Sequence, residues 1–218
     1  MLPPNVSAGI TTRLREVQEV LSHLRRIEAA PGQPEGPEVR LLRGLFYVHL
    51  YGAFEYGINS IVSAAAQVIN GAAVPHNQLI DSIGAIVLNA QFNAVGQASP
   101  QNQWSKRLGL IERRASPHIA SIDDGAIDLQ NIWLKTIEQL FAVFGILKPA
   151  MYDVTKSGYV FELTDTRNKI AHGRESPIDI GRRRRASELQ LLYDSISLEI
   201  FYFLDSFDDY LKNAEYKV

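Results

Sequence analysis

The chain has 218 residues, of which 46% are hydrophobic and 21% are charged, an ordinary globular composition that suffices for one sizeable core. Its formal net charge of -2 argues against a protein that coats nucleic acid indiscriminately, so any RNA contact would come from a local basic patch. The absence of cysteine excludes disulfides and thiolate metal sites, and it fits a cytoplasmic location.

Neither a metal site nor a membrane segment is expected. The five histidines show no His-X3-His or similar ligand spacing, so we expect no bound metal and no cofactor. The first seven residues lack the basic and apolar segments of a secretory signal. Polar residues interrupt every long apolar stretch before it could span a membrane. We therefore expect a soluble protein with a single domain over residues 1–218.

The first part of the chain predicts two amphipathic helices. Residues 11–29 carry apolar side chains at helical spacing, and Thr11 or Thr12 is a suitable N-cap. Three prolines and two glycines within residues 31–37 end this helix. A second, long helix is expected over residues 38–70. Its small residues, which would let neighbouring helices approach closely, are Gly44, Gly52, Gly57 and Ala64 to Ala66.

A glutamate interrupts the apolar stripe of this second helix. The apolar members of the stripe are Val48, Tyr51, Ile58 and Val62, and Glu55 falls between them. A buried carboxylate is costly unless it has a partner, so we expect Glu55 to pair with a cation, and we predict Arg167. A solvated carboxylate at the edge of the stripe is the alternative.

The middle of the chain, residues 71–127, predicts a short helix followed by a long polar insertion. The helix corresponds to an apolar run within residues 74–90, and the segment from 91 to 103 is rich in Asn, Gln, Gly and Ser. Trp104 and the basic residues near it could contribute an RNA surface, with stacking by the indole. A solvated helical turn is the favoured explanation of those charges.

Three further stretches complete the helical pattern. Helices are expected from Asp128 to about residue 145 and over residues 159–172, with Gly173 as the C-terminal cap of the latter. Ser187-X-X-Gln190 resembles a capping box, which places the start of the last helix near residue 187 and its end near residue 211. Its predicted inward-facing residues are Leu189, Leu192, Ile196, Ile200, Phe203, Phe207 and Leu211.

A cluster of cations lies around the start of the last helix. It comprises Arg182, Arg183, Arg184 and Arg185, and with Lys169 and Arg174 these are the candidate RNA-binding residues. Cations at the positive end of a helix dipole are unfavourable alone, and a visiting phosphate would explain them. Pairing with acidic residues across a subunit interface, or simple exposure to solvent, remain alternatives.

The stretch Arg167-Asn168-Lys169-Ile170-Ala171-His172-Gly173 combines a guanidinium, an amide and an imidazole near the end of a helix. Asn168 and His172 lie one turn apart on one face, so the amide can hydrogen-bond the imidazole and fix its tautomer. A permanent cation beside a titratable imidazole suits phosphoryl chemistry at RNA. The same residue types are also common at helix C-termini for purely structural reasons.

The string RNKIAHG closely resembles the Arg-X4-His signature of the HEPN superfamily. These are small all-helical domains, and many are metal-independent RNases in toxin-antitoxin, antiviral and CRISPR systems. Tyr51-X3-Glu55 is similar to a pattern in the second helix of one HEPN branch. The resemblance implies an all-α fold, an antiparallel bundle of about five helices, and the absence of strand signals agrees with it.

The resemblance also implies a homodimeric endoribonuclease whose two Arg-His motifs line one cleft. Arg167, His172 and Asn168 would be the catalytic residues, with Glu55 and Tyr51 in support. The products would be a 2',3'-cyclic phosphate and a 5'-OH. An antitoxin or a nucleotidyltransferase is a further partner that the resemblance suggests. Two interpretations compete with catalysis: a helical module that only binds RNA, a nucleotide or a protein, and a purely structural helix terminus.

Overall fold

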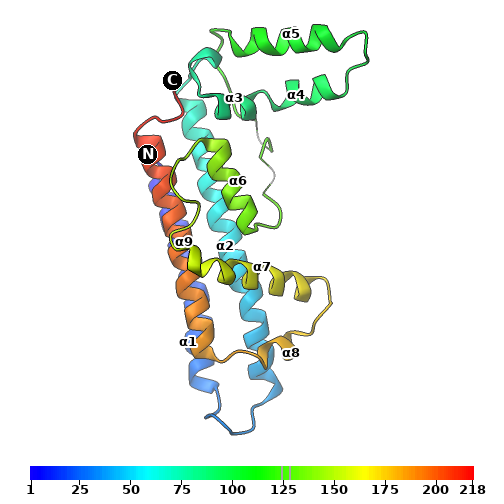
Figure 1. The fold of residues 1–218 in the computed structure, drawn as a ribbon. Coiled ribbons are helices and arrows are strands. Elements are labelled where there is room, and N and C mark those ends of the chain that lie inside the picture. The colour runs from blue at the N-terminus through cyan, green and yellow to red at the C-terminus, as the bar shows by residue number, and fades with distance from the viewer. Residues whose placement is uncertain (124, 128) are drawn as a thin grey trace.

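Helices form nearly all of the regular structure (Figure 1). The computed structural model describes residues 1–123, 125–127 and 129–218. The α-helices are α1 (Pro4–Ile27), α2 (Pro37–Gly71), α3 (Asp81–Val87), α4 (Asn89–Gly96), α5 (Gln103–Arg114), α6 (Leu134–Phe144), α7 (Ser157–Ala171), α8 (Pro177–Gly181) and α9 (Ala186–Lys212), and the 3-10 turns are η1 (His76–Gln78) and η2 (Val154–Lys156). The described residues form two isolated bridges and no strand, so the predicted all-α fold is confirmed.

The long helix α2 lies at the centre of the fold and packs against α1, α7, α8 and α9. α1 and α2 form an antiparallel hairpin (Figure 1). The start of α9 lies near the start of α2. The Ala186 N–H donates to the Glu28 carboxylate, and the same carboxylate pairs with Arg43 near the start of α2. Its end lies beyond the end of α2, where Lys217 forms a bridge with Leu79. α9 therefore runs in the same direction as α2.

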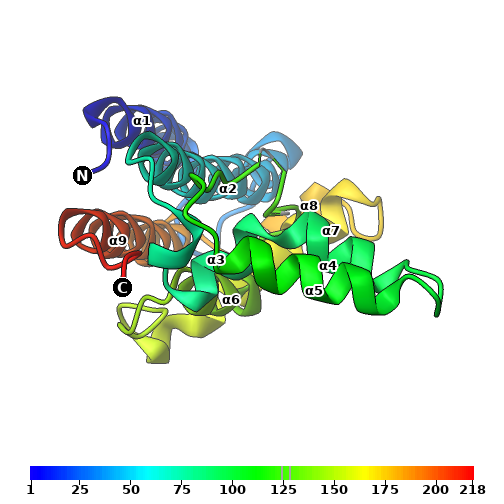
Figure 2. The ribbon, with the colours of Figure 1, turned by 90° about the horizontal axis from the view of Figure 1, so that it is seen from above.

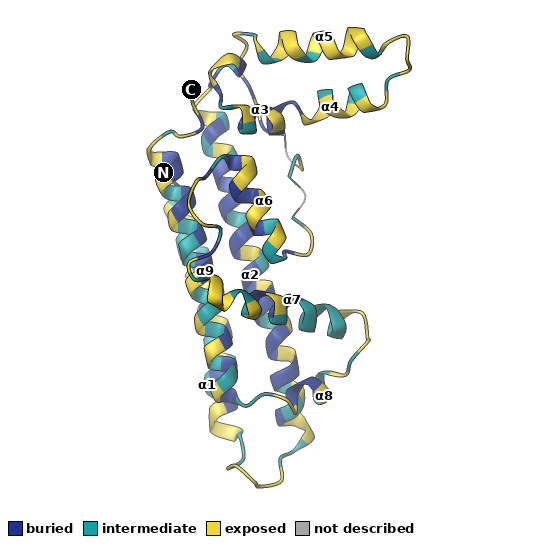
Figure 3. Ribbon diagram, in the orientation of Figure 1, coloured by how far each residue is buried: buried dark blue, intermediate teal, exposed yellow. Residues whose placement is uncertain are grey.

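The buried faces of the long helices follow the predicted periodicity. All seven residues predicted to face inward from the last helix are buried in α9, and the predicted apolar residues of the first helix are buried in α1. On α2, Tyr51, Ile58 and Val62 are buried and Glu55 is half-buried, whereas Val48 is exposed. Figure 3 shows this division, with buried residues on the inner faces of the bundle.

Glycine allows α2 and α8 to touch through their backbones. A Cβ atom on Gly44 would lie 2.0 Å from the carbonyl oxygen of Pro177, and one on Gly181 would lie 1.8 Å from that of Arg40. Both distances are far shorter than any van der Waals contact, so neither position tolerates a side chain. The predicted close approach at Gly44 is thus present, whereas Gly52 faces open space.

Helix α7 crosses the long helices at a steep angle (Figure 1), and α6 contacts α3 and α7. Leu163 and Thr164 are the buried residues near the middle of α7, and the Thr164 hydroxyl donates to the Ile132 carbonyl at 3.0 Å. This bond joins α7 to the segment that leads into α6. The Thr164 hydroxyl thus fixes α7 against this segment, and α7 also packs against α2.

The middle of the chain differs from the predicted polar insertion. It contains α3, α4 and α5, which raises the helix count above the expected five, and α4 and α5 form a hairpin that projects from the bundle (Figures 1 and 2). No residue of α4 or α5 is buried. The hairpin is anchored at its base by Arg114, which donates to the carbonyls of His76 and Leu79 and pairs with Asp81.

Several predicted helix ends were wrong. α1 starts at Pro4, because proline suits the first helical turn, and the hydroxyls of Thr11 and Thr12 bond back to carbonyls inside the helix. The predicted start at Asp128 lies outside the described residues, and α6 runs only from Leu134. The predicted start of the last helix near residue 187 is confirmed, since α9 starts at Ala186, but Glu188 rather than Gln190 accepts the capping bond from the backbone.

Candidate functional site

Tyr51 and Glu55 lie one turn apart on α2 and face α7. The Tyr51 hydroxyl donates to Glu55 Oε1 at 3.1 Å and accepts the Ile132 N–H at 2.9 Å. Burial raises the pKa of the Tyr51 phenol to about 12, so the hydroxyl stays protonated at neutral pH and can donate. Tyr51 thereby ties α2 to the segment before α6 and holds the Glu55 carboxylate toward α7.

The Arg167 guanidinium sits in a pocket of protein acceptors at this junction. Its Nη1 donates to Asn131 Oδ1 at 2.9 Å and to Asn168 Oδ1 at 2.8 Å. Its Nη2 lies 3.6 Å from Glu55 Oε1, and the guanidinium carbon lies 4.1 Å from the centre of the Tyr51 ring. The predicted pairing of Glu55 with Arg167 is therefore confirmed. With 22% of its side chain exposed, Arg167 is a positioned cation that solvent can still reach.

His172 caps the C-terminal end of α7 and is exposed. Gly173 follows with a φ of 65°, and the Arg174 N–H donates to the Lys169 carbonyl at 2.8 Å, which closes a Schellman motif. The predicted glycine cap is therefore confirmed. Across the described part of the chain, no hydrogen bond or ion pair engages the His172 imidazole. The imidazole is therefore available to contact a group from outside the chain.

Asn168 engages the arginine rather than the histidine. Its amide oxygen accepts from Arg167, the adjacent residue, and within residues 1–123, 125–127 and 129–218 no side-chain hydrogen bond joins it to His172. The physical reason is competition, because a charged donor is a stronger partner for the amide oxygen than a neutral imidazole. The expected role of Asn168 in orienting His172 stays a prediction.

Most of the candidate RNA-binding cations pair with carboxylates of the same chain. Lys169 lies 2.9 Å from Asp165 and 3.3 Å from Glu175. The pairs of the arginine cluster are Arg182 with Asp179, Arg183 with Glu175, Arg184 with Glu162 and Glu188, and Arg185 with Glu28. Arg174 is exposed and has no ion-pair partner among the described residues. The acidic partners of these cations therefore lie within the same chain, and pairing across an interface stays untested.

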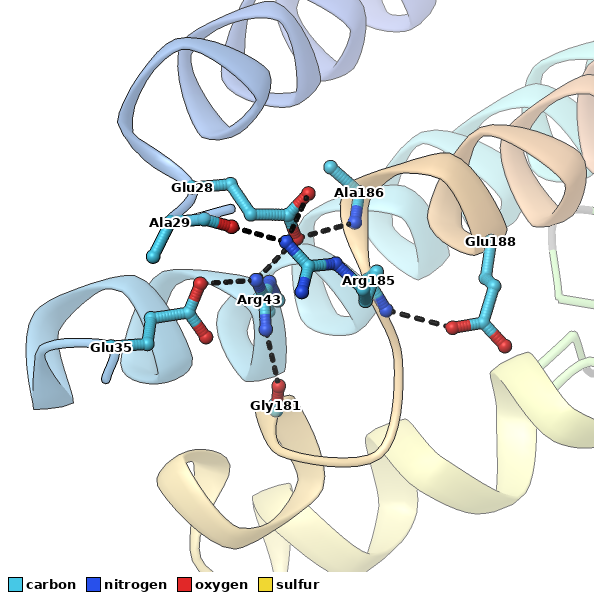
Figure 4. A network of polar contacts seen from close by, with 8 residues as sticks. All are labelled: Glu28, Ala29, Glu35, Arg43, Gly181, Arg185, Ala186 and Glu188. Atoms are coloured by element: carbon cyan, nitrogen blue, oxygen red, sulfur yellow. Dashed lines mark hydrogen bonds and ion pairs between the residues drawn. The ribbon is translucent and has the colours of Figure 1, made fainter. Parts of the chain in front are cut away.

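Arg185 belongs to a network that fixes the end of the bundle (Figure 4). It donates to the Ala29 carbonyl, and its partner Glu28 also pairs with Arg43, whose side chain is only 3% exposed. Arg43 contacts Glu35 and the Gly181 carbonyl as well. Sequence analysis missed this network. A lone arginine within the apolar run of residues 41–48 is the signal that could have revealed Arg43.

Sequence analysis also missed three contributors to the Arg167 pocket. Asn131 and the backbone of Ile132 come from an irregular segment, and Thr164 lies within α7 but outside the motif. No periodic pattern marks Asn131, so nothing in the sequence could have placed it beside Arg167. Thr164 is a polar residue on the buried face of α7, and that position was a usable signal.

Two classes of site find no candidate in the described residues. No three histidine, aspartate or glutamate side chains gather there in a way that could hold a metal ion. None of the helices described is both long enough and apolar enough to cross a membrane.

Comparison with protein families agrees with the helical fold. A family model described as RiboL-PSP-HEPN matches residues 10–213. The chain therefore belongs to the RiboL-PSP-HEPN family, and the predicted membership in the HEPN superfamily is confirmed. Neither the curated proteins nor the solved structures gave a significant match. Family membership indicates an RNase-like or RNA-binding module.

Proposed function

We propose that the protein is a metal-independent endoribonuclease that acts as a homodimer. The observation that carries this proposal is the arrangement at the end of α7. There, Arg167 is held by Glu55, Tyr51 and Asn131, while His172, five residues further on, is exposed and unengaged within the described chain. A fixed cation and a free imidazole are the two groups that RNA cleavage by internal attack requires.

The chemistry follows from these two side chains and the substrate. His172 of one protomer removes the proton from a ribose 2'-OH, whose oxygen attacks the adjacent phosphorus. The bond from phosphorus to the 5'-oxygen breaks, and His172 of the second protomer protonates that oxygen. Arg167 stabilises the negative charge on the phosphoryl oxygens. The products are a 2',3'-cyclic phosphate and a 5'-OH, and no metal is needed because the ribose supplies the nucleophile.

The neighbouring residues support this chemistry in our proposal. Glu55 and Tyr51 hold the guanidinium in place, and Asn168 turns toward His172 when Arg167 engages the phosphate. Arg174 follows His172 by two residues, has no carboxylate partner among the described residues, and in our proposal contacts an adjoining phosphate. The RNA phosphates compete with carboxylates for Lys169 and for the cluster formed by Arg182, Arg183, Arg184 and Arg185.

The biological role that we propose is that of a toxin or antiviral effector acting on cytoplasmic RNA. A free nuclease of this kind would harm its own cell, so a restraining partner is expected. An antitoxin that covers the site, or a nucleotidyltransferase that modifies it, would serve. A neighbouring reading frame encoding either protein would support this role.

The decisive experiment incubates the purified chain with total RNA and maps the cut ends and their chemistry. We expect His172→Ala and Arg167→Ala each to abolish cleavage, and we expect EDTA to leave it unchanged. His23→Ala is the matched control, because His23 is also exposed on a helix but lies on α1. Equal thermal unfolding of all variants would exclude misfolding. Cleavage that survives both substitutions would overturn the assignment.

A non-catalytic RNA-, nucleotide- or protein-binding module is the second candidate. It is favoured by the full engagement of Arg167, which in the single chain contacts Asn131, Asn168 and Glu55 instead of pointing at an open cleft. Such a module would bind RNA without forming product, and its affinity would fall steeply as salt rises. The absence of cut ends under conditions that give saturated binding would select it over the nuclease.

A further inference from the structure

Two aromatic side chains border a hollow on the outer side of α7. The rings of Trp133 and Phe161 lie with their centres 5.8 Å apart and their planes tilted by 46°. Phe161 is 61% exposed, and Trp133 is half-buried. An exposed phenylalanine held against an indole leaves aromatic faces available to a flat, apolar group.

The aromatic pair is built onto the same framework as Arg167. Trp133 directly follows Ile132, whose N–H is bound by Tyr51 and whose carbonyl is bound by Thr164. Phe161 precedes Arg167 by six residues on α7, which corresponds to roughly 9 Å along the helix axis. Those six residues also turn the helix by about 240°, so Phe161 and Arg167 leave α7 on different sides. The link between the hollow and the Arg167 guanidinium is the segment 131–133, in which Asn131 accepts a hydrogen bond from Arg167 and Trp133 lines the hollow.

The hollow has a cavity volume of about 570 Å³, which is ample for a nucleobase. Besides the two rings, its lining includes Leu134, Lys135 and Glu138 and the first residues of α7. One lysine and one glutamate leave this lining without net charge. The lining therefore has no net charge that would attract phosphate. The main interaction that it provides is stacking on the two aromatic faces.

We propose that Trp133 and Phe161 form a stacking subsite for an unpaired base of the RNA whose scissile phosphate lies at Arg167. This inference rests on the proposed function and narrows its substrate class to single-stranded RNA. In a duplex both faces of every internal base are covered by its neighbours, so only an unpaired base can stack on a protein ring. Base stacking is tolerant of sequence, so the subsite selects for single strands and not for a particular base.

Tryptophan fluorescence can test the subsite directly. The chain has two tryptophans, so Trp104→Phe leaves Trp133 as the single emitter. The added substitution His172→Ala prevents cleavage during the titration. A short single-stranded oligoribonucleotide should quench the Trp133 emission on binding. The same sequence annealed to its complement should not quench it at equal concentration.

Substitutions at Phe161 measure the contribution of the second ring. Phe161→Ala should weaken binding of the single strand by about 5- to 100-fold, whereas Phe161→Tyr, which keeps an aromatic face, should retain the affinity. Phe92→Ala is the matched control, because Phe92 is 49% exposed but lies on α4 in the projecting hairpin. It should bind as tightly as the parent.

The outcomes separate this inference from the proposed function. If the wild-type chain cuts RNA but Phe161→Ala leaves both KM and the fluorescence titration unchanged, the subsite is refuted and the nuclease stands. If the chain binds single-stranded RNA at Trp133 but yields no cut ends, the nuclease is refuted and the subsite stands. Equal quenching by single-stranded and duplex RNA would overturn the proposed preference for unpaired bases.

Discussion

The buried guanidinium of Arg43 illustrates how much a single residue can contribute to this fold. It contacts the carboxylates of Glu28 and Glu35 and the Gly181 carbonyl, and so joins the α1–α2 loop to the segment before α9 (Figure 4). Arg43→Met should lower the free energy of unfolding by about 3–5 kcal/mol, because removing one partner leaves carboxylates buried without their cation. Urea denaturation followed by circular dichroism measures this loss.

Arg182 provides the control for that measurement. Its pair with Asp179 joins two side chains that are 58% and 55% exposed, so water screens the attraction. Arg182→Met should therefore change the free energy of unfolding by no more than about 1 kcal/mol. Similar losses for the two substitutions would show that burial of Arg43 does not determine its contribution.

At the scale of elements, the backbone contact between α2 and α8 predicts that Gly44 and Gly52 differ in how well they tolerate a side chain. Gly44→Ala should destabilise the fold by about 1–3 kcal/mol or more, since its Cβ would overlap the Pro177 carbonyl and force the two helices apart. Gly52→Ala lies two turns further along the same helix and meets no atom within 4 Å. It should be neutral or stabilise by up to about 1 kcal/mol, because alanine is the better helix former. Thermal unfolding of the pair tests both signs at once.

The sequence predicts some helices better than others, because different interactions determine where each helix begins and which of its residues are buried. α9 was predicted because its apolar residues recur at helical spacing from Leu189 to Leu211, and this period identifies most of the buried residues, with Glu199 and Ser206 as polar exceptions. The start of α1 was missed because Pro4 sets it, through a backbone preference that the apolar pattern does not contain. α5 was missed because it buries no residue, so its helical period serves no core.

The residues of the candidate site also differ in how well the sequence predicts them. Glu55 was predicted to need a cation because a carboxylate on an apolar stripe is costly when buried, and the predicted partner was Arg167. Asn131 and Glu28 could not be predicted, since their partners are distant in sequence and are brought close only by the packing of α7 and α9 onto α2. Local physics identifies which side chains need a partner, and tertiary structure decides which partner they receive.

On the scale of the whole molecule, α2 connects the regions that the proposed function requires. It supplies Tyr51 and Glu55 to the Arg167 pocket, and its contact with α8 fixes the segment that carries the arginine cluster. The α4–α5 hairpin projects from the end of the bundle opposite α8 (Figure 1). A single chain thus offers one Arg167 and one His172, whereas the proposed reaction needs one imidazole as base and another as acid. The second must come from another copy.

Mixing active and inactive chains tests this requirement. Wild-type protein is combined with increasing fractions of His172→Ala at constant total concentration, and the subunits are allowed to exchange before RNA cleavage is measured. If each active site needs both copies of His172, activity follows the square of the wild-type fraction. With random association, that square is the fraction of dimers in which both chains are wild-type. An equal mixture should then retain about one quarter of the activity, against about one half if each chain works alone. Replacing His172→Ala by His23→Ala as the diluting chain should leave activity unchanged at every ratio, which controls for effects of mixing itself. A linear decline with the wild-type fraction would contradict the composite site while leaving the cleavage assignment to be judged by the single-variant assays.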